Sequence, residues 1–147
     1  MLVILMYKIQ LATLADVPTL TEYARDFITF YNVMEFDAES VSVTLTHVIN
    51  TGCVYIATLN DDVIAAIGGV CATNPWNRTQ AIWQEMFWWV FPKYRNTFVG
   101  IKLLKLFEQA APTNSTISLS ILPQTDLKQE TLAKLNYKLV EQTYIKE

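Results

Sequence analysis

The stretch from residue 80 to residue 111 constrains the fold more than any other part of the sequence. Its first part, QAIWQEMFWWV, is rich in the aromatic residues that favour strands and predicts a strand over 80–90. Pro92 ends this run, and Arg95 lies in the turn that follows. Apolar residues then recur at helical spacing, which predicts an amphipathic helix over 100–111. This order is typical of proteins that pack helices against a sheet.

Periodicity elsewhere in the chain predicts a mixed sheet in one α/β (α+β) domain that spans residues 1–147. Apolar runs predict strands over 5–12, 53–59, 63–73 and 116–122, and one or two short strands over 138–147. Helical spacing predicts helices over 13–32, 38–50 and 126–135. The expected order is β-α-α-β-β-β-α-β-α-β, with six to seven strands and about four helices. No repeat or Pro/Gly-rich linker divides the chain.

Composition narrows the classes of function. The net charge of -3 gives no field that would attract nucleic acid or an anionic membrane, so neither is expected as a partner. The apolar N-terminal segment lacks the charged region and cleavage site of an export signal, and we interpret it as a buried first strand. Cys53 and Cys71 lie in apolar runs without metal spacing, which favours reduced core thiols in a cytoplasmic protein.

The sequence lacks the residues that several kinds of catalytic centre require. His47 is the only histidine and lies far from the 80–111 stretch, so a structural role is expected for it. The sequence contains no Ser-His-Asp set, no Walker-type glycine loop and no cluster with metal-ligand spacing. Hydrolase, nucleoside triphosphatase and metal-dependent functions are therefore not expected.

The turn before the 100–111 helix has the chemistry of an anion site. The first turn of a helix has backbone N–H groups without internal partners, and the helix dipole adds partial positive charge there. A phosphate binds well at such an end. Arg95 adds a forked donor, and Gly100 lets the backbone approach a ligand closely. The alternative is an ordinary strand-turn-helix whose basic residues are solvated.

Val90, Pro92, Tyr94, Arg95 and Gly100 follow one another in the spacing V-x-P-x-Y-R-x-x-x-x-G. This spacing resembles the pattern V-x-P-x-[YF]-[RQ]-x-x-G-x-[GA] of the GNAT superfamily of acyl-CoA-dependent N-acyltransferases, and the sequence looks most like the small phage-encoded members. The segments KIQLATLADVPTLTEY and LAKLNYKLVEQTYI resemble the first and last parts of the family. The similarity thus covers nearly the whole chain, although only residues 88–109 are specific.

The resemblance implies an acyl-CoA, usually acetyl-CoA, as the cofactor and transfer of its acetyl group to an amine. The pyrophosphate would lie on the backbone amides from Arg95 to Gly100, and the pantetheine arm beside the end of the 80–90 strand. The cofactor-binding residues implied in this way are Val90, Arg95, Asn96, Thr97, Phe98, Val99, Gly100 and Ile101. Three places depart from the family pattern and favour a module without turnover: Phe98 replaces a glycine, Leu132 occupies the place of a catalytic tyrosine, and Asn136-Tyr137 stands where the family has Gly-Phe. No catalytic acid is assigned.

Glu85 is the expected catalytic base, because some family members carry a glutamate in this part of the strand. Strand alternation places it on the opposite sheet face from Val90 and on the same face as Trp89. Trp83, Phe87 and Trp89 would desolvate its carboxylate and raise its pKa. A solvated surface carboxylate is the alternative.

Two functions remain open at this stage. The first is an N-acetyltransferase acting on an amine of a protein or of a small molecule. The second is a GNAT-fold module that has lost turnover and binds acyl-CoA or a host protein, which the departures at Phe98 and Leu132 favour. In the family the acceptor lies over segments that here are 30–39 and 74–78. The acidic and aromatic residues of 30–39 would suit a cationic or aromatic amine, or a solvated loop.

Overall fold

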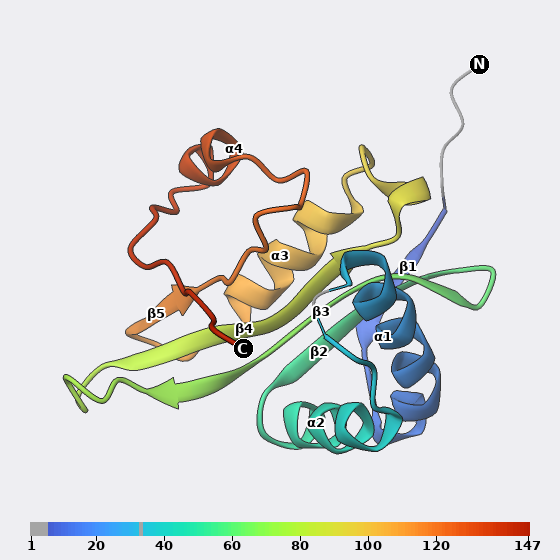
Figure 1. Ribbon diagram of the computed structural model, residues 1–147, viewed down its shortest axis with the longest axis horizontal. Helices are drawn as coiled ribbons and strands as arrows, with labels where there is room; N and C mark the ends of the chain where they lie inside the picture. Colours follow the sequence, from blue (N-terminus) through green and yellow to red (C-terminus); the bar gives the residue numbers. More distant parts are fainter. Residues whose placement is uncertain (1–5, 33) are drawn as a thin grey trace.

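A five-stranded mixed sheet forms the centre of the protein in the computed structural model, which describes residues 6–32 and 34–147 (Figure 1). Its strands are β1 (Lys8–Leu11), β2 (Cys53–Leu59), β3 (Asp62–Thr73), β4 (Ala81–Val90) and β5 (Ser115–Ser118). They lie in the order β1-β2-β3-β4-β5. The first four strands are antiparallel to their neighbours, and β5 pairs with β4 in parallel.

Helices cover both faces of this sheet (Figure 1). They are α1 (Val17–Tyr31), α2 (Ala38–Thr51), α3 (Val99–Gln109) and the short α4 (Gln129–Lys134), with 3-10 turns at η1 (Leu14–Asp16) and η2 (Pro92–Tyr94). Helices α1 and α2 share one core with the sheet, which includes Leu20, Leu45, Val48, Val54 and Trp89. Helix α3 forms the other core, which includes Ile67, Trp83, Leu103, Leu104 and Phe107. The predicted α/β class is confirmed.

Local signals account for the elements that were predicted well. Asn60 and Asp61 both have positive φ, 51° and 68°, as a two-residue hairpin turn with the right twist requires. This turn joins β2 to β3 where the sequence predicted a break. Helix α2 begins after Asp37, whose carboxylate accepts a hydrogen bond from the Ser40 backbone N–H at 2.9 Å.

A β-bulge in β4 reverses which face its residues occupy. Gly68 pairs with Phe87 and Gly69 pairs with Glu85, so Met86 is an extra residue between the two pairs. As a result, Trp83 lies in the core under α3 whereas Trp89 lies in the core under α1 and α2. Simple alternation would have placed both tryptophans on one face.

Gly69 makes this bulge sterically possible. A Cβ atom at Gly69 would lie 2.2 Å from the Gln84 carbonyl oxygen and 2.6 Å from the Phe107 ring. We therefore expect Gly69→Ala to lower the free energy of unfolding by about 2 kcal/mol, because a backbone atom has to move. Denaturant unfolding would measure the loss. Gly100→Ala is the control, because its Cβ would come no closer than 3.2 Å, to a Val90 methyl group. Equal stability of the two variants would contradict this account.

Three predictions about the sheet were wrong. No strand forms over 138–147 among the described residues, and Leu139, Val140, Tyr144 and Ile145 are largely exposed there. The sheet has five strands rather than six to seven, because an alternating segment becomes a strand only where a partner edge is available. Strand β5 ends at Ser118 rather than at residue 122.

The first strand and the cysteines also differ from expectation. Strand β1 covers only Lys8–Leu11 and is mostly exposed, because it is an edge strand that pairs with β2 alone; residue 5 lies outside the described residues. Cys71 is exposed rather than in the core, and Cys53 is half-buried, which raises the pKa of its thiol to about 11 by desolvation. No described helix has both the length and the apolar character needed to cross a membrane.

Candidate active site

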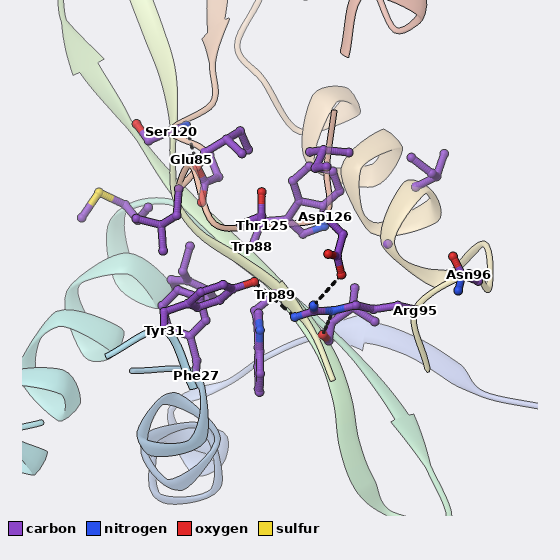
Figure 2. A pocket seen from close by; sticks show the side chains of 18 of the residues that line it. Phe27, Tyr31, Glu85, Trp88, Trp89, Arg95, Asn96, Ser120, Thr125 and Asp126 are labelled. Atoms are coloured by element: carbon purple, nitrogen blue, oxygen red, sulfur yellow. Dashed lines mark hydrogen bonds and ion pairs between the residues drawn. The ribbon is translucent and has the colours of Figure 1, made fainter. Parts of the chain in front are cut away.

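The strands β4 and β5 separate at one edge of the sheet, and a pocket opens there. Their last pair is Gln84 with Ser118, and residues 119–122 then leave the sheet. The pocket has a volume of about 430 Å³ and lies between β4, α1, the start of α3 and residues 120–127 (Figure 2). It contains both the predicted base and most of the predicted cofactor residues.

Six of the eight predicted cofactor-binding residues line this pocket: Val90, Arg95, Asn96, Thr97, Gly100 and Ile101. The other two do not. The Phe98 side chain is 78% exposed and lies outside the pocket lining, so it leaves the pocket open. Val99 is fully buried in the core under α3. Thus the departure from the family glycine at position 98 is accommodated by a side chain in solvent.

The start of α3 presents unused backbone donors. Among the described residues, no protein group accepts a hydrogen bond from the backbone N–H groups of 96–101. The turn before the helix is set by Asn96, whose φ is 65°. Because N–H groups at a helix start carry partial positive charge, this end of the pocket can hold an anion.

Arg95 is more constrained than its sequence suggested. Its Nε donates to the Val90 carbonyl at 3.0 Å, Nη1 pairs with the Asp126 carboxylate at 3.1 Å, and Nη2 donates to the Tyr31 hydroxyl at 3.2 Å (Figure 2). The Arg95 side chain is 20% exposed and that of Asp126 is 85% exposed. Arg95 therefore links the end of β4, α1 and the 120–127 segment, and two of its five N–H donors have no acceptor among the residues that the structure describes.

Glu85 is buried at the point where the strands separate, with 4% of its surface exposed. Its carboxylate accepts a hydrogen bond from the Ser120 backbone N–H at 2.9 Å (Figure 2). Desolvation by burial raises the pKa of Glu85 to about 7, and the Ser120 hydrogen bond partly opposes that rise. A carboxyl group with this pKa can both accept and release a proton near neutral pH.

The predicted face of Glu85 was wrong. Its cross-strand partner Gly69 faces Phe107 of α3, so Glu85 lies on the α3 side of the sheet. Val90 shares that side, and Trp89 lies on the other. The bulge at Met86 is the physical reason, because it adds one residue between Glu85 and Val90.

Three polar groups that line the pocket were not predicted as site residues. The indole N–H groups of Trp88 and Trp89 and the hydroxyl of Thr125 are buried, and none has a hydrogen-bond partner among the described residues. Buried polar atoms without partners are rare in proteins and mark places where a ligand or water completes the hydrogen bonding. The sequence predicted Trp89 as a neighbour that would desolvate Glu85, and it gave no signal for Thr125.

Other candidates from the sequence lie away from the pocket lining. Leu132 is not part of it, and Tyr137 donates its hydroxyl to Glu108 at 3.0 Å; the pKa of Tyr137 is raised, chiefly by burial. His47 is exposed on α2. Of the two predicted acceptor segments, 30–39 contributes Tyr31 and Met34 and 74–78 contributes nothing. The described residues contain no group of three or more His, Cys, Asp or Glu that could hold a metal ion.

Solved acetyltransferase structures share this fold. One is a predicted acetyltransferase from Clostridium acetobutylicum with acetyl-CoA, at a TM-score of 0.79 and 14% identity over 97% of this chain and 96% of that one. A possible acetyltransferase from Clostridium difficile 630 has a TM-score of 0.73 and 18% identity over 96% and 97% of the two chains. An aminoglycoside acetyltransferase from a soil metagenomic sample, in complex with sisomicin, has a TM-score of 0.65 and 15% identity over 96% and 97%.

These similarities show that the chain shares the fold of these solved structures. The chain has the GNAT fold, as its resemblance to that superfamily implied. By sequence, it matches no protein-family model and no curated protein.

Proposed function

We propose that this protein is an N-acetyltransferase that transfers the acetyl group of acetyl-CoA to an amine. The observation that supports the proposal is a single pocket lined both by the unused amide donors at the start of α3 and by the buried carboxylate of Glu85. The first feature suits the pyrophosphate of the cofactor. The second suits the removal of a proton from the acceptor amine.

The residues of the pocket fit acetyl-CoA. A Cβ atom at Gly100 would lie 3.2 Å from a Val90 methyl group and 3.8 Å from the Trp88 indole nitrogen, so the glycine leaves space beside β4. The Trp88 N–H and the Thr125 hydroxyl are unpartnered donors in the same pocket. Pantetheine carries amide carbonyls that such donors can bind. The backbone N–H groups of 96–101 would hold the pyrophosphate.

Acetyl-CoA supplies an acyl group activated as a thioester. Glu85 would take the proton that the amine loses as its nitrogen bonds to the acetyl carbon, while the carbon–sulfur bond breaks and its electron pair leaves on sulfur. A pKa of about 7 suits this role, since Glu85 is then partly ionised at neutral pH and still basic enough to accept a proton.

A GNAT-fold module without turnover, binding acyl-CoA or a protein partner, is the second candidate. It is favoured by the position of Leu132 and Tyr137, neither of which lines the pocket, so the proton donor to the leaving sulfur has no counterpart of the family tyrosine. Turnover of acetyl-CoA in the presence of amines separates the two functions.

Calorimetric titration with acetyl-CoA tests the cofactor site. We expect a micromolar Kd for the unmodified protein, about -8 kcal/mol. Gly100→Leu should weaken binding at least tenfold, because its side chain fills the space beside Val90 and Trp88. Lys105→Leu is the matched control, because Lys105 is exposed on the same helix and lies outside the pocket lining. Thermal melts would verify that both variants fold. Equal affinity of the two variants would remove the start of α3 from the cofactor site.

A further inference from the structure

Residues from both faces of β4 line the pocket: Trp88 packs toward α3, whereas Phe87 and Trp89 pack toward α1 and α2. The part toward α3 holds the amide donors, Trp88 and Thr125, and suits an anionic, amide-rich cofactor. The part toward α1, which we call the α1 chamber, is lined by Phe27, Tyr31, Met34, Phe87 and Trp89. If the proposed function holds, the α1 chamber is the space left for the body of the acceptor, whose amine has to reach Glu85, a residue of the α3 side that lines the same pocket.

The α1 chamber has a rigid aromatic wall. The ring of Phe27 packs edge-to-face against those of Trp89 and Tyr31, with centroids 5.6 and 5.3 Å apart. Trp89 is 4% exposed, and Tyr23 both packs edge-to-face against its ring at 5.2 Å and donates its hydroxyl to the Trp89 carbonyl. Aromatic side chains held in this way favour a flat or apolar ligand body.

The charges around the α1 chamber disfavour a ligand with several positive charges. Two carboxylates line the whole pocket: Glu85, which the transfer would use as the base, and Asp126, which is already paired with Arg95 at 3.1 Å. The Arg95 guanidinium lies at the edge of the chamber, 3.2 Å from the Tyr31 hydroxyl and 5.3 Å from the centre of the Phe30 ring. The Arg95 guanidinium would repel a second ammonium group of the ligand. Apart from Glu85, the described residues that line the pocket include no unpaired carboxylate to bind that group.

The acidic residues of 35–39, around the start of α2, add no negative charge to the pocket lining. Asp37 caps α2, and Glu35 and Glu39 are exposed outside the pocket lining. One polar group of a lining residue is left to bind a ligand: the indole N–H of Trp89 is buried, has no hydrogen-bond partner among the described residues, and can donate to an oxygen of a ligand.

We infer that the acceptor is a small monoamine with an aromatic or apolar body, and that the Trp89 N–H donates a hydrogen bond to it. This inference rests on the proposed function and makes it more specific. The sisomicin complex of the soil metagenomic acetyltransferase shows that the same fold can hold a polycation. The α1 chamber lacks the carboxylates that such a ligand requires, so a polyamine or aminoglycoside is a poor acceptor here.

Initial rates of acetylation test this selectivity. The probes are phenethylamine and tyramine as aromatic monoamines, and spermidine and sisomicin as polycations, each with saturating acetyl-CoA. We expect kcat/KM for the monoamines to exceed that for the polycations at least 100-fold. Equal or faster acetylation of the polycations would overturn the inference. Acetyl-CoA binding without acetylation of either monoamine would also overturn it, whereas failure of acetyl-CoA to bind would overturn the proposed function itself.

Two variants test the residues of the α1 chamber. Trp89→Phe keeps an aromatic ring and removes the N–H, so KM for tyramine should rise about tenfold while the Kd for acetyl-CoA is unchanged; Trp76→Phe, at an exposed position, is the control. Met34→Glu adds a carboxylate to the chamber wall and should improve kcat/KM for spermidine relative to tyramine about tenfold. Met6→Glu, exposed and outside the pocket lining, is its control. An unchanged KM in Trp89→Phe, or an unchanged preference in Met34→Glu, would overturn the assignment of the α1 chamber.

Discussion

Replacing Glu85 with glutamine is expected to slow acetyl transfer by roughly 10² to 10⁴-fold, the usual contribution of a general base. The amide has nearly the same shape and can still accept the Ser120 hydrogen bond, so the fold and the Kd for acetyl-CoA should not change. Steady-state kinetics with an aromatic monoamine and a parallel calorimetric titration measure the two quantities. Glu130→Gln, an exposed change on α4, is the control.

The pH dependence of acetyl transfer by the unmodified protein checks the same role. Glu85 must be ionised to accept a proton, so kcat/KM should rise with pH and level off above its pKa of about 7. In Glu85→Gln the rise of kcat/KM with pH should be absent from the residual activity. If Glu85→Gln has the rate of the unmodified protein, or if its kcat/KM still rises with pH in the same range, Glu85 is not the base.

The same substitution is expected to stabilise the protein in alkaline solution. Burial raises the pKa of Glu85 from 4.5 in the unfolded chain to about 7 in the folded one. Between these values the folded state binds a proton that the unfolded state does not, so the free energy of unfolding falls as pH rises. The loss amounts to about 3 kcal/mol above pH 8 and vanishes below pH 4.

Glu85→Gln has no carboxyl group to ionise and should escape this loss. Denaturant unfolding at pH 4 and at pH 8 would show equal stability at the lower pH and an advantage of about 3 kcal/mol for the variant at the higher pH. If the difference in free energy of unfolding between Glu85→Gln and the unmodified protein is the same at both pH values, the carboxylate of Glu85 is not desolvated. The substitution would therefore gain stability and lose turnover, as is common where a strained or buried group performs the chemistry.

Much of the fold could be predicted because local chemistry and periodicity agree. The two-residue turn at Asn60 and Asp61 defines the β2–β3 hairpin, and the apolar stripe of α3 defines its buried face. The segment 138–147 shows the limit of this reasoning. Its alternation is that of a strand, yet strand formation depends on a partner edge that no local pattern specifies.

The candidate site was predicted where a contiguous motif carried it. Five of the seven residues of 95–101, all except Phe98 and Val99, line the pocket, because backbone geometry there follows from the order of strand, turn and helix. The face of Glu85 was missed, because the bulge at Met86 arises from close packing at Gly69 against Phe107. The Arg95–Asp126 pair was missed as well, since the two residues are 31 positions apart and meet only through the path of the 120–127 segment.

The pairing of faces in β4 has a consequence for how this protein can be studied in solution. The consecutive residues Trp88 and Trp89 lie on opposite faces of the strand, Trp88 toward α3 and Trp89 toward α1, and both line the pocket. Indole fluorescence responds to the polarity and hydrogen bonding of the ring. A ligand that enters the pocket should therefore change the tryptophan emission of the protein without any attached label.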